Sequence, residues 1–381
     1  MLISLIISKF IAGFGGTALP GLIGLRLTPT LINQIVKKNK LASVVVTGTN
    51  GKTTTSRLLG AVLTESKINF CHNRSGSNLL RGIATALINQ SNWLGKIKSK
   101  LAICEVDEAA APAAIRALKP KIIVFTNISR DQLDRYGEVD HLLKLWQKSL
   151  DTLPSASRVL VNAADRRLKI LKHPRLTYFG SSLPGAGLKY PPRYGGKFNQ
   201  DSLWAIEAVC RHLDLDPKLA AVCAQKTKAA FGRGEVFKLD GQKYQINLVK
   251  NPASFKAVWQ MLADRRHLNQ PFMLALNDKL ADGTDVSWIW DVPFTGLGRR
   301  RKPIIVTGTR ASDLALRLKY AGCNPKNLFV EPKIYPALAA LRKIPGTIKY
   351  ILPTYTALLE LRQSLGKQAW NELWFISIRI F

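Results

Sequence analysis

The sequence predicts an α/β protein in which a phosphate-binding domain with a parallel sheet is followed by a second α/β domain. Short apolar runs alternate with helical stretches, which is typical of parallel strands joined by crossover helices. A glycine-containing turn, residues 47–54, follows the first apolar run, and the alternation resumes after residue 236. The 381 residues suffice for two domains or three, and 46% of them are hydrophobic.

The first domain begins with a strand that leads into the turn. Residues 41–46 (Leu-Ala-Ser-Val-Val-Val) predict a buried strand. Residues 52–66 carry helical periodicity through Leu58, Leu59, Val62 and Leu63. Further strands are expected at 101–106, 122–126 and 159–162, and helices at 109–118, 141–150 and 199–213.

The second domain repeats the alternation. Residues 180–198 are rich in glycine and proline and predict a surface loop, and residues 231–235 predict the junction between the domains. We therefore expect an N-terminal helical segment over 1–40, a central domain over 41–235 and a C-terminal domain over 236–381. Strands are expected there at 244–249, 272–276, 304–307, 328–330 and 350–352, and helices at 254–265 and 311–321.

The chain is strongly basic, with 56 lysines and arginines against 25 acids and a formal net charge of +31. Such a field attracts nucleic acid, anionic membranes or polyphosphorylated substrates, although a basic solvated surface is the plain alternative. The charge is spread along the whole chain, and no zinc finger, KH or RNP signature occurs. We therefore expect no nucleic-acid partner.

The N-terminal 26 residues are apolar, but Lys9 and several glycines interrupt them. No unbroken apolar stretch reaches the roughly 20 residues that a membrane span needs. We expect a packed helix here, or one that touches a membrane surface. The five cysteines are scattered without a CxxC pair, so neither disulfides nor a zinc site are expected, and a reducing cytosol fits.

The turn after the first strand predicts a nucleotide-phosphate site. Glycines allow backbone N–H groups to converge on phosphate oxygens, and the following helix adds its positive N-terminal dipole. Lys52 would reach the β- and γ-phosphates of ATP, and the Thr53 hydroxyl would bind Mg²⁺. The predicted cofactor-binding residues of the turn are Gly48, Thr49, Asn50, Gly51, Lys52, Thr53 and Thr54.

Polar clusters follow the next two strands at the edge where open α/β sheets bind ligands. Residues 105–108 include three acids, and a carboxylate there could hold Mg²⁺ or could instead stabilise a helix N-terminus. Residues 127–137 add Asn, Arg, Asp and Gln side chains. In the second domain, Trp288 and Trp290 stand among acids, as core residues or as a partner-binding face. No GxSxG motif and no cysteine in a nucleophile setting are present.

These motifs resemble the Mur ligase family. Residues 47–55, 73–82, 105–108 and 127–137 are similar to its central domain. Within the family, the C-terminal domain most resembles that of the MurT group, the ligase subunits of lipid II isoglutaminyl synthases. That second likeness rests on residues 231–235, 250–252, 277–291 and 352–357.

The resemblance implies an activity. Such a ligase subunit uses ATP and Mg²⁺ to amidate the α-carboxyl of D-glutamate in the lipid II stem peptide, through an acyl phosphate. Ammonia comes from a GatD-type glutaminase partner. The implied location is the cytoplasm, or peripheral at the inner face of the cytoplasmic membrane.

The resemblance also implies roles for individual residues. Lys52 and Glu108 would be catalytic, and Thr53 and Glu108 would bind Mg²⁺. An aspartate of the chain would complete the partner's catalytic site, with Asp291 favoured over Asp285. Nucleotide contacts from beyond the phosphate loop would come from Arg233, Asn251, Asn277 and Asp278.

Three features depart from the family pattern. Residues 163–198 hold no cysteine, so the four-cysteine zinc ribbon of many MurT chains is expected to be absent. Gln132 stands where many Mur ligases have histidine, and no uridine-nucleotide domain is expected before the phosphate loop. Two alternatives are an amino-acid-adding ligase of the Mur or folylpolyglutamate type, and a basic nucleotide-dependent binding protein.

Overall fold

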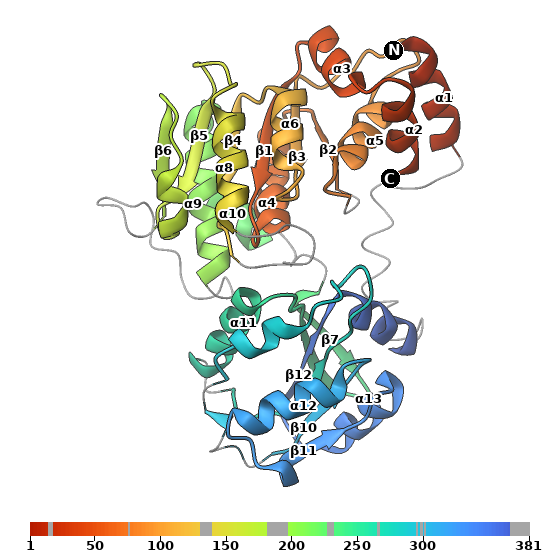
Figure 1. Ribbon diagram of the computed structural model, residues 1–381, viewed down its shortest axis with the longest axis vertical. Coiled ribbons are helices and arrows are strands. Elements are labelled where there is room, and N and C mark those ends of the chain that lie inside the picture. The colour runs from red at the N-terminus through yellow and green to blue at the C-terminus, as the bar shows by residue number, and fades with distance from the viewer. Residues whose placement is uncertain are drawn as a thin grey trace. The chain divides into compact units, whose positions relative to one another are not determined.

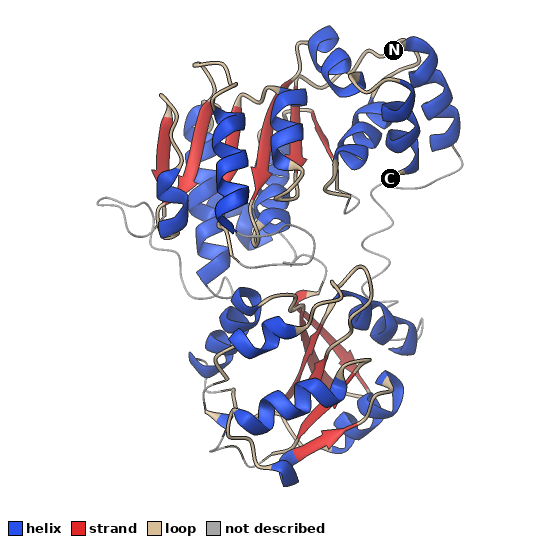
Figure 2. Ribbon diagram, viewed as in Figure 1, coloured by secondary structure: helices blue, strands red, loops and turns tan. Residues whose placement is uncertain are grey.

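The chain folds as two compact units, each with a sheet between helices (Figures 1 and 2). The described part of the first unit ends at residue 226, and that of the second begins at 232. This computed structural model describes residues 1–13, 18–74, 77–129, 139–180, 197–226, 232–264, 267–294, 296–297, 300 and 302–365.

The first unit is built on a six-stranded sheet in the order β2-β3-β1-β4-β5-β6, and all of its neighbouring strands are parallel. The strand before the phosphate loop, β1, lies between β3 and β4. The four predicted strands are present, and two short strands that we had not predicted, β2 and β6, form the edges. The strands are β1 (Ala42–Thr47), β2 (Phe70–His72), β3 (Leu101–Glu105), β4 (Ile122–Phe125), β5 (Arg158–Asn162) and β6 (Leu176–Phe179).

Helices cover both faces of this sheet, as expected for a parallel sheet buried on both sides. Alternate residues of β1 enter different cores: Val45 packs with one set of helices, and Val44 and Val46 pack with the other. The first set is α3 (Leu31–Asn39), α5 (Leu80–Gln90), α6 (Ala111–Leu118) and α8 (Val139–Leu150), and the second is α4 (Lys52–Glu65), α9 (Lys197–His212) and α10 (Leu219–Lys226). A short 3-10 helix, η1 (Arg166–Ile170), follows β5.

The N-terminal segment forms three helices, α1 (Leu2–Ala12), α2 (Leu19–Leu27) and α3, where we expected a packed helix. Helix α2 approaches α5 so closely that a Cβ on Gly21 would lie 1.8 Å from the Arg81 carbonyl oxygen. The Gly21 N–H donates to Thr85 Oγ1 at 2.9 Å. Only glycine permits this contact. Among the helices that the structure describes, none is both long and apolar enough to cross a bilayer.

The second unit has a six-stranded sheet in the order β11-β10-β9-β12-β8-β7. The five predicted strands are present and parallel, and β7 pairs antiparallel with β8 at one edge. Residues 233–235, which we had placed at the domain junction, begin β7. The strands are β7 (Arg233–Leu239), β8 (Gln242–Asn247), β9 (Phe272–Ala275), β10 (Ile304–Thr307), β11 (Leu328–Val330) and β12 (Ile348–Pro353).

Helices again lie on both faces of this second sheet. Phe272 and Leu274 of β9 pack with α11, α12 and the 3-10 helix η3, whereas Met273 packs with α13 and a helix over 355–365. Most of the predicted loop, residues 181–196, lies outside the described residues. The helical elements are α11 (Pro252–Asp264), η3 (Ser287–Asp291), α12 (Ala311–Tyr320), η5 (Pro325–Asn327) and α13 (Ile334–Lys343).

His72 at the end of β2 makes a pH-dependent contribution to stability. Burial, and then the charges of Arg74 and Arg57, lower the pKa of His72 from 6.5 to about 3. The folded pKa lies below the unfolded value, so this stability is present above about pH 6.5 and is lost as the pH falls toward 3.

We predict that His72→Gln flattens the pH dependence of the free energy of unfolding between pH 7 and pH 5. The effect is at most about 1.4 kcal/mol per pH unit, the value for one proton. Urea unfolding of both proteins at both pH values measures it. Parallel declines in the two proteins would contradict the prediction.

Candidate functional site

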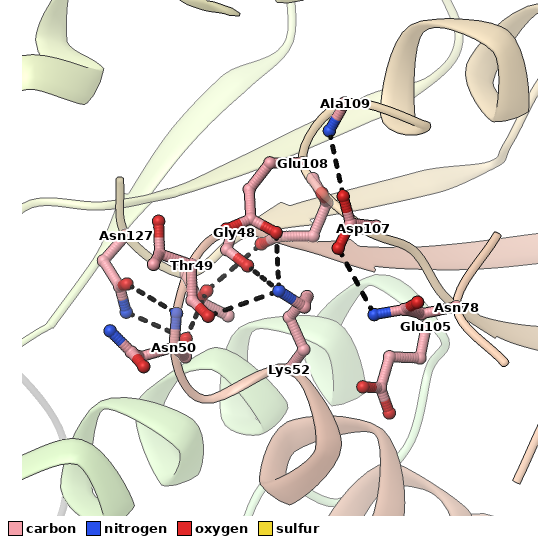
Figure 3. Close-up of polar contacts among 12 residues, drawn as sticks. Gly48, Thr49, Asn50, Lys52, Asn78, Glu105, Asp107, Glu108, Ala109 and Asn127 are labelled. Atoms are coloured by element: carbon pink, nitrogen blue, oxygen red, sulfur yellow. Dashed lines mark hydrogen bonds and ion pairs between the residues drawn. The ribbon is translucent and has the colours of Figure 1, made fainter. Parts of the chain in front are cut away.

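The phosphate loop turns sharply between β1 and α4, at the carboxyl end of a central strand (Figure 3). Gly48 has a φ of +126°, and a Cβ there would lie 2.3 Å from Thr126 Oγ1. Gly51 has a φ of +87° and directly precedes the first residue of α4, Lys52. Both positions demand glycine, and the first N–H groups of α4 lack partners within the helix.

The residues that follow β4 hold this loop in place. Asn127 and Asn50 form a reciprocal pair: the Asn50 N–H donates to Asn127 Oδ1, and Asn127 Nδ2 donates to the Asn50 carbonyl, each at 2.9 Å. Thr126 Oγ1 also donates to the Asn50 carbonyl at 2.7 Å, and the Thr49 N–H donates to the Asn127 carbonyl at 2.9 Å. The loop conformation is therefore fixed by the protein itself.

Lys52 folds back over the loop and meets Glu108 (Figure 3). Its Nζ donates to Glu108 Oε2 at 2.8 Å, to the Thr49 carbonyl at 3.2 Å and to the Gly48 carbonyl. Lys52 is 6% exposed and Glu108 is 4% exposed. Trp146 Nε1 donates to the Glu108 carbonyl at 2.9 Å. The buried Lys52 ammonium is thus paired with a carboxylate and held against a loop whose backbone is suited to binding phosphates.

A second pair lies one residue further on, where Thr53 Oγ1 donates to Glu105 Oε1 at 2.8 Å. Asn73 binds the backbone of Glu105 through two hydrogen bonds. Asn73 Nδ2 donates to the Glu105 carbonyl at 2.8 Å, and the Glu105 N–H donates to Asn73 Oδ1 at 2.9 Å. A hydroxyl and a carboxylate are hard oxygen ligands and fit Mg²⁺. The family resemblance implied Glu108 as the acidic ligand, which stays a prediction, and Glu105 is the carboxylate that contacts Thr53.

Two arginines lie near this pair. Burial and the charge of Arg74 lower the pKa of Arg57, while the carboxylate of Glu105 opposes them. Arg57 stands one helical turn after Thr53 on α4, so the two side chains share a face. The sequence analysis did not single out Arg57 or Arg74, because isolated arginines in a basic chain carry no motif. Together with Lys52 they make this edge of the sheet suited to anions.

Helix α9 adds residues that no motif indicated. Asp201 and Ser202 line a small hollow with Asn50 and Gly51 of the phosphate loop. Thr55 Oγ1 of α4 donates to Ser202 Oγ at 3.0 Å, which ties the two helices together beside the loop. Thr54, the last predicted residue of the loop, is partly buried in the first turn of α4.

The predicted nucleotide contacts of the second unit lie in polar networks at the carboxyl ends of its strands. Asn277 is 1% exposed; its Nδ2 donates to Thr356 Oγ1 at 3.0 Å and to Glu360 Oε1 at 3.1 Å. Its Oδ1 accepts the Thr309 N–H at 3.0 Å. Asp278 Oδ1 accepts the Thr309 hydroxyl at 2.8 Å. These side chains tie the ends of β9, β10 and β12 together, and their contact with a nucleotide stays a prediction.

Asn251 is buried and caps α11, since its Oδ1 accepts the Ser254 N–H at 2.8 Å. This local role also accounts for an asparagine before Pro252. Arg233 starts β7, but its side chain lies outside the described residues. Nucleotide contacts by Asn251 and Arg233 therefore stay predictions as well.

The two aspartates expected to serve a partner flank η3, and both are exposed. Asp285 lies two residues before η3 and accepts the Ser287 N–H at 2.8 Å and the Ser287 hydroxyl at 2.9 Å. Asp291, at the end of η3, makes no hydrogen bond or ion pair with any residue that the structure describes. Trp290 beside it is 49% exposed, whereas Trp288 packs against the core. Asp291 is thus the aspartate left available.

Part of the polar cluster after β4 cannot be placed, because residues 130–138, with Gln132, lie outside the described residues. Within the described ranges, no group of three or more histidines, cysteines or acids could hold a metal ion. The absence of a zinc site stays a prediction.

Comparisons with known proteins match both units. The model of the Mur ligase middle domain matches residues 46–181, and that of the MurT ligase C-terminal domain matches residues 248–358. The MurT subunit of lipid II isoglutaminyl synthase (glutamine-hydrolysing) from Staphylococcus aureus (strain COL) is 30% identical, over 93% of this chain and 94% of that protein. The corresponding subunit from Streptococcus pneumoniae (strain ATCC BAA-255 / R6) is 27% identical over 93% of each.

Solved structures agree on the fold. MurF from Acinetobacter baumannii superposes with a TM-score of 0.71 at 16% identity, over 92% of this chain and 81% of that one. Folylpolyglutamate synthase from Mycobacterium tuberculosis gives a TM-score of 0.58 at 16% identity, over 89% and 95%. The fold, the full-length relatives and the matched C-terminal domain agree, and the chain belongs to the MurT group of the Mur ligase family.

Proposed function

We propose that this chain is the ligase subunit of a lipid II isoglutaminyl synthase and works in peptidoglycan biosynthesis. It amidates the α-carboxyl of D-glutamate in the lipid II stem peptide to D-isoglutamine. The match of the MurT C-terminal domain over residues 248–358 carries the proposal, because that domain separates this group from other Mur ligases. The relatives from two organisms, matched over almost their full length, support it.

The phosphate loop fits the first half of this chemistry. Bound ATP supplies the γ-phosphoryl group that converts the carboxylate to an acyl phosphate, from which ammonia displaces phosphate. Lys52, held by Glu108 at 2.8 Å, would meet the phosphate oxygens and offset the charge that develops on them. The N–H groups at the start of α4 would add to this field. Because Asn50 and Asn127 fix the loop beforehand, little reorganisation would be needed.

Thr53 and Glu105 are the residues that would hold Mg²⁺, because their oxygens already lie 2.8 Å apart. Glu108 would then act mainly by orienting Lys52. Both assignments are proposals, and they divide between two carboxylates the roles that the family resemblance implied for Glu108.

The ammonia for this reaction must be produced by another protein. Glutamine hydrolysis by a thiol needs a reactive thiolate, and all five cysteines of this chain are buried. Burial raises the pKa of Cys71 and of Cys210 to about 12 and raises that of Cys104 as well. These thiols are unsuited to nucleophilic attack. We therefore propose a GatD-type glutaminase subunit as partner, in line with the names of the relatives.

The partner would meet the surface around η3. Trp290 and Tyr320 are exposed, and their ring centroids lie 5.8 Å apart. Arg317 stacks over Trp290 at 5.5 Å and donates to the carbonyls of Ile289 and Val292, so the aromatic pair is held in place. Asp291 stands beside this pair, where its carboxylate can enter a partner's site. The lipid-linked substrate places the complex in the cytoplasm at the inner face of the membrane.

Amidation is tested by incubating the chain and its glutaminase partner with lipid II, ATP, Mg²⁺ and glutamine, followed by mass spectrometry. We expect a carboxyl to become an amide, with a small decrease in mass. Lys52→Ala should slow this at least about 100-fold, because the transition-state charge loses its counterion. Lys148→Ala, at an exposed position of α8, is the control. A mass increase would instead indicate amino-acid addition, and near-normal turnover by Lys52→Ala would refute the role of the loop.

The two carboxylates should respond differently to magnesium. Glu105→Gln should raise the Mg²⁺ concentration for half-maximal amidation by roughly tenfold or more, because a charged ligand is replaced by a neutral one. Glu108→Gln should lower kcat with a smaller change in the Mg²⁺ requirement. Titrating Mg²⁺ at saturating ATP measures both, and the reverse pattern would return the metal to Glu108.

Asp291→Asn should reduce glutamine-dependent amidation by roughly 100-fold or more while amidation with added ammonium chloride persists. Asp285→Asn should have a smaller effect, since that side chain already accepts two hydrogen bonds from Ser287. The ratio of the two activities in each variant is the measured quantity. Equal loss with both nitrogen sources would show that Asp291 acts in the ligase reaction or in folding.

A further inference from the structure

Helix α1 is amphipathic in the opposite sense to an ordinary surface helix. Apart from the buried Leu5, most of its large apolar side chains point to solvent, with Ile3 76% exposed and Phe10 65% exposed. Its serines point inward, with Ser4 4% exposed and Ser8 0% exposed. Surface helices of soluble proteins normally bury the apolar stripe and expose the polar one. The exposed apolar residues of α1, all on one side of the helix, are Leu2, Ile3, Ile6, Ile7 and Phe10.

Close packing against α2 explains why the serines of α1 point inward. Nothing within the described residues explains why its apolar side chains point outward. A Cβ on Gly24 of α2 would lie 2.8 Å from Ser8 Oγ, and Ser4 Oγ lies 2.7 Å from Thr28 Oγ1. Small side chains therefore let α1 and α2 approach closely, and Leu5 anchors α1 in the core. Figure 1 shows α1 at the edge of the first unit, beside α2 and α5. The outer face is thus firmly presented.

The turn after α5 extends this apolar surface. Trp93 is 57% exposed and Leu94 is 59% exposed. The turn lies against α1, since a Cβ on Gly95 would be 3.2 Å from Leu5 Cδ2. Lys9 joins the two parts: its Nζ lies 5.6 Å from the Trp93 ring centroid and donates to the Ile88 carbonyl at 3.0 Å. We call the outer face of α1 with Trp93 and Leu94 the apolar face.

Positive charge borders the apolar face. Lys38 donates to the Leu94 carbonyl at 2.6 Å, and Lys37, Lys96 and Lys98 are exposed nearby in the sequence. Residues 1–104 contain 13 lysines and arginines and a single acid, Glu65. Aliphatic side chains with a tryptophan and a lysine rim match the boundary of an anionic bilayer, where tails take the apolar groups and headgroups take the charges.

We infer that the apolar face docks the chain on the surface of a bilayer that carries anionic lipids. Helix α1 has 11 residues, too few to span, so it lies in the interface plane. The inference draws on the proposed function only for its purpose, which is to bring the ligase to a substrate carried on a lipid. The docking itself rests on the exposure and charge of the first unit.

Co-sedimentation with vesicles tests the docking. The full chain should bind to phosphatidylcholine vesicles that contain phosphatidylglycerol, and this binding should weaken as the salt concentration is raised. Binding to vesicles of phosphatidylcholine alone should be much weaker. Ile3→Ser with Phe10→Ser should lower the partition coefficient at least about tenfold. Phe329→Ser with Tyr335→Ser, which removes exposed apolar surface from the second unit, should leave it unchanged.

A second variant, Trp93→Ser with Leu94→Ser, should reproduce the loss from a different element. The inference would be overturned if wild-type protein bound equally well to vesicles with and without the anionic lipid. It would also be overturned if both apolar-face variants bound as well as wild type. The same would follow if sedimentation velocity showed that the wild-type chain is a dimer and that the variant with Ile3→Ser and Phe10→Ser is a monomer. Amidation of detergent-solubilised lipid II should persist in that variant. Absence of amidation in wild type, with vesicle binding intact, would instead count against the proposed function.

Discussion

The buried ion pair between Lys52 and Glu108 is the interaction on which the site depends. A lysine that is only 6% exposed needs a counterion, because removing a charge from water is costly unless it is paired and hydrogen-bonded. The pair also joins the loop after β1 to the segment after β3, while Asn50 and Asn127 join that loop to the segment after β4. The ends of three neighbouring strands are thus linked around the proposed phosphate site.

The carboxyl ends of the strands in the second unit are also linked by polar side chains. Asn277, Thr309 and Thr356 link the ends of three strands, and Gly308, with a φ of +101°, turns as closely after β10 as Gly48 does after β1. Ser312 stands four residues after Gly308, where Lys52 stands four residues after Gly48, so this turn has no lysine at the corresponding position. The exposed chemistry of this unit lies instead around η3, where Asp291 and Trp290 face solvent.

Sequence patterns predicted the elements whose cause is local. The valine run predicted the buried strand β1, which was confirmed, and the glycines at 48 and 51 of the predicted turn adopt positive φ. Strands β2 and β6 were missed because neither is an unbroken apolar run: His72 ends β2 and Thr177 interrupts β6, whereas the equally short edge strand β11 is apolar throughout. The Thr53–Glu105 contact joins residues 52 positions apart, so only the register of β1 on β3 could disclose it. The orientation of α1 could not be predicted either, since composition does not show which face of an apolar helix turns inward.

The central claim is that the loop passes a phosphoryl group from ATP to a carboxylate. It is tested most directly with lipid II whose glutamate α-carboxyl carries ¹⁸O, turned over with ATP, Mg²⁺ and ammonium and with Lys52→Ala as the blank. If an acyl phosphate forms, one carboxyl oxygen leaves with the phosphate, so the inorganic phosphate must carry ¹⁸O in step with amide formation. Amide formed with unlabelled phosphate would contradict the account.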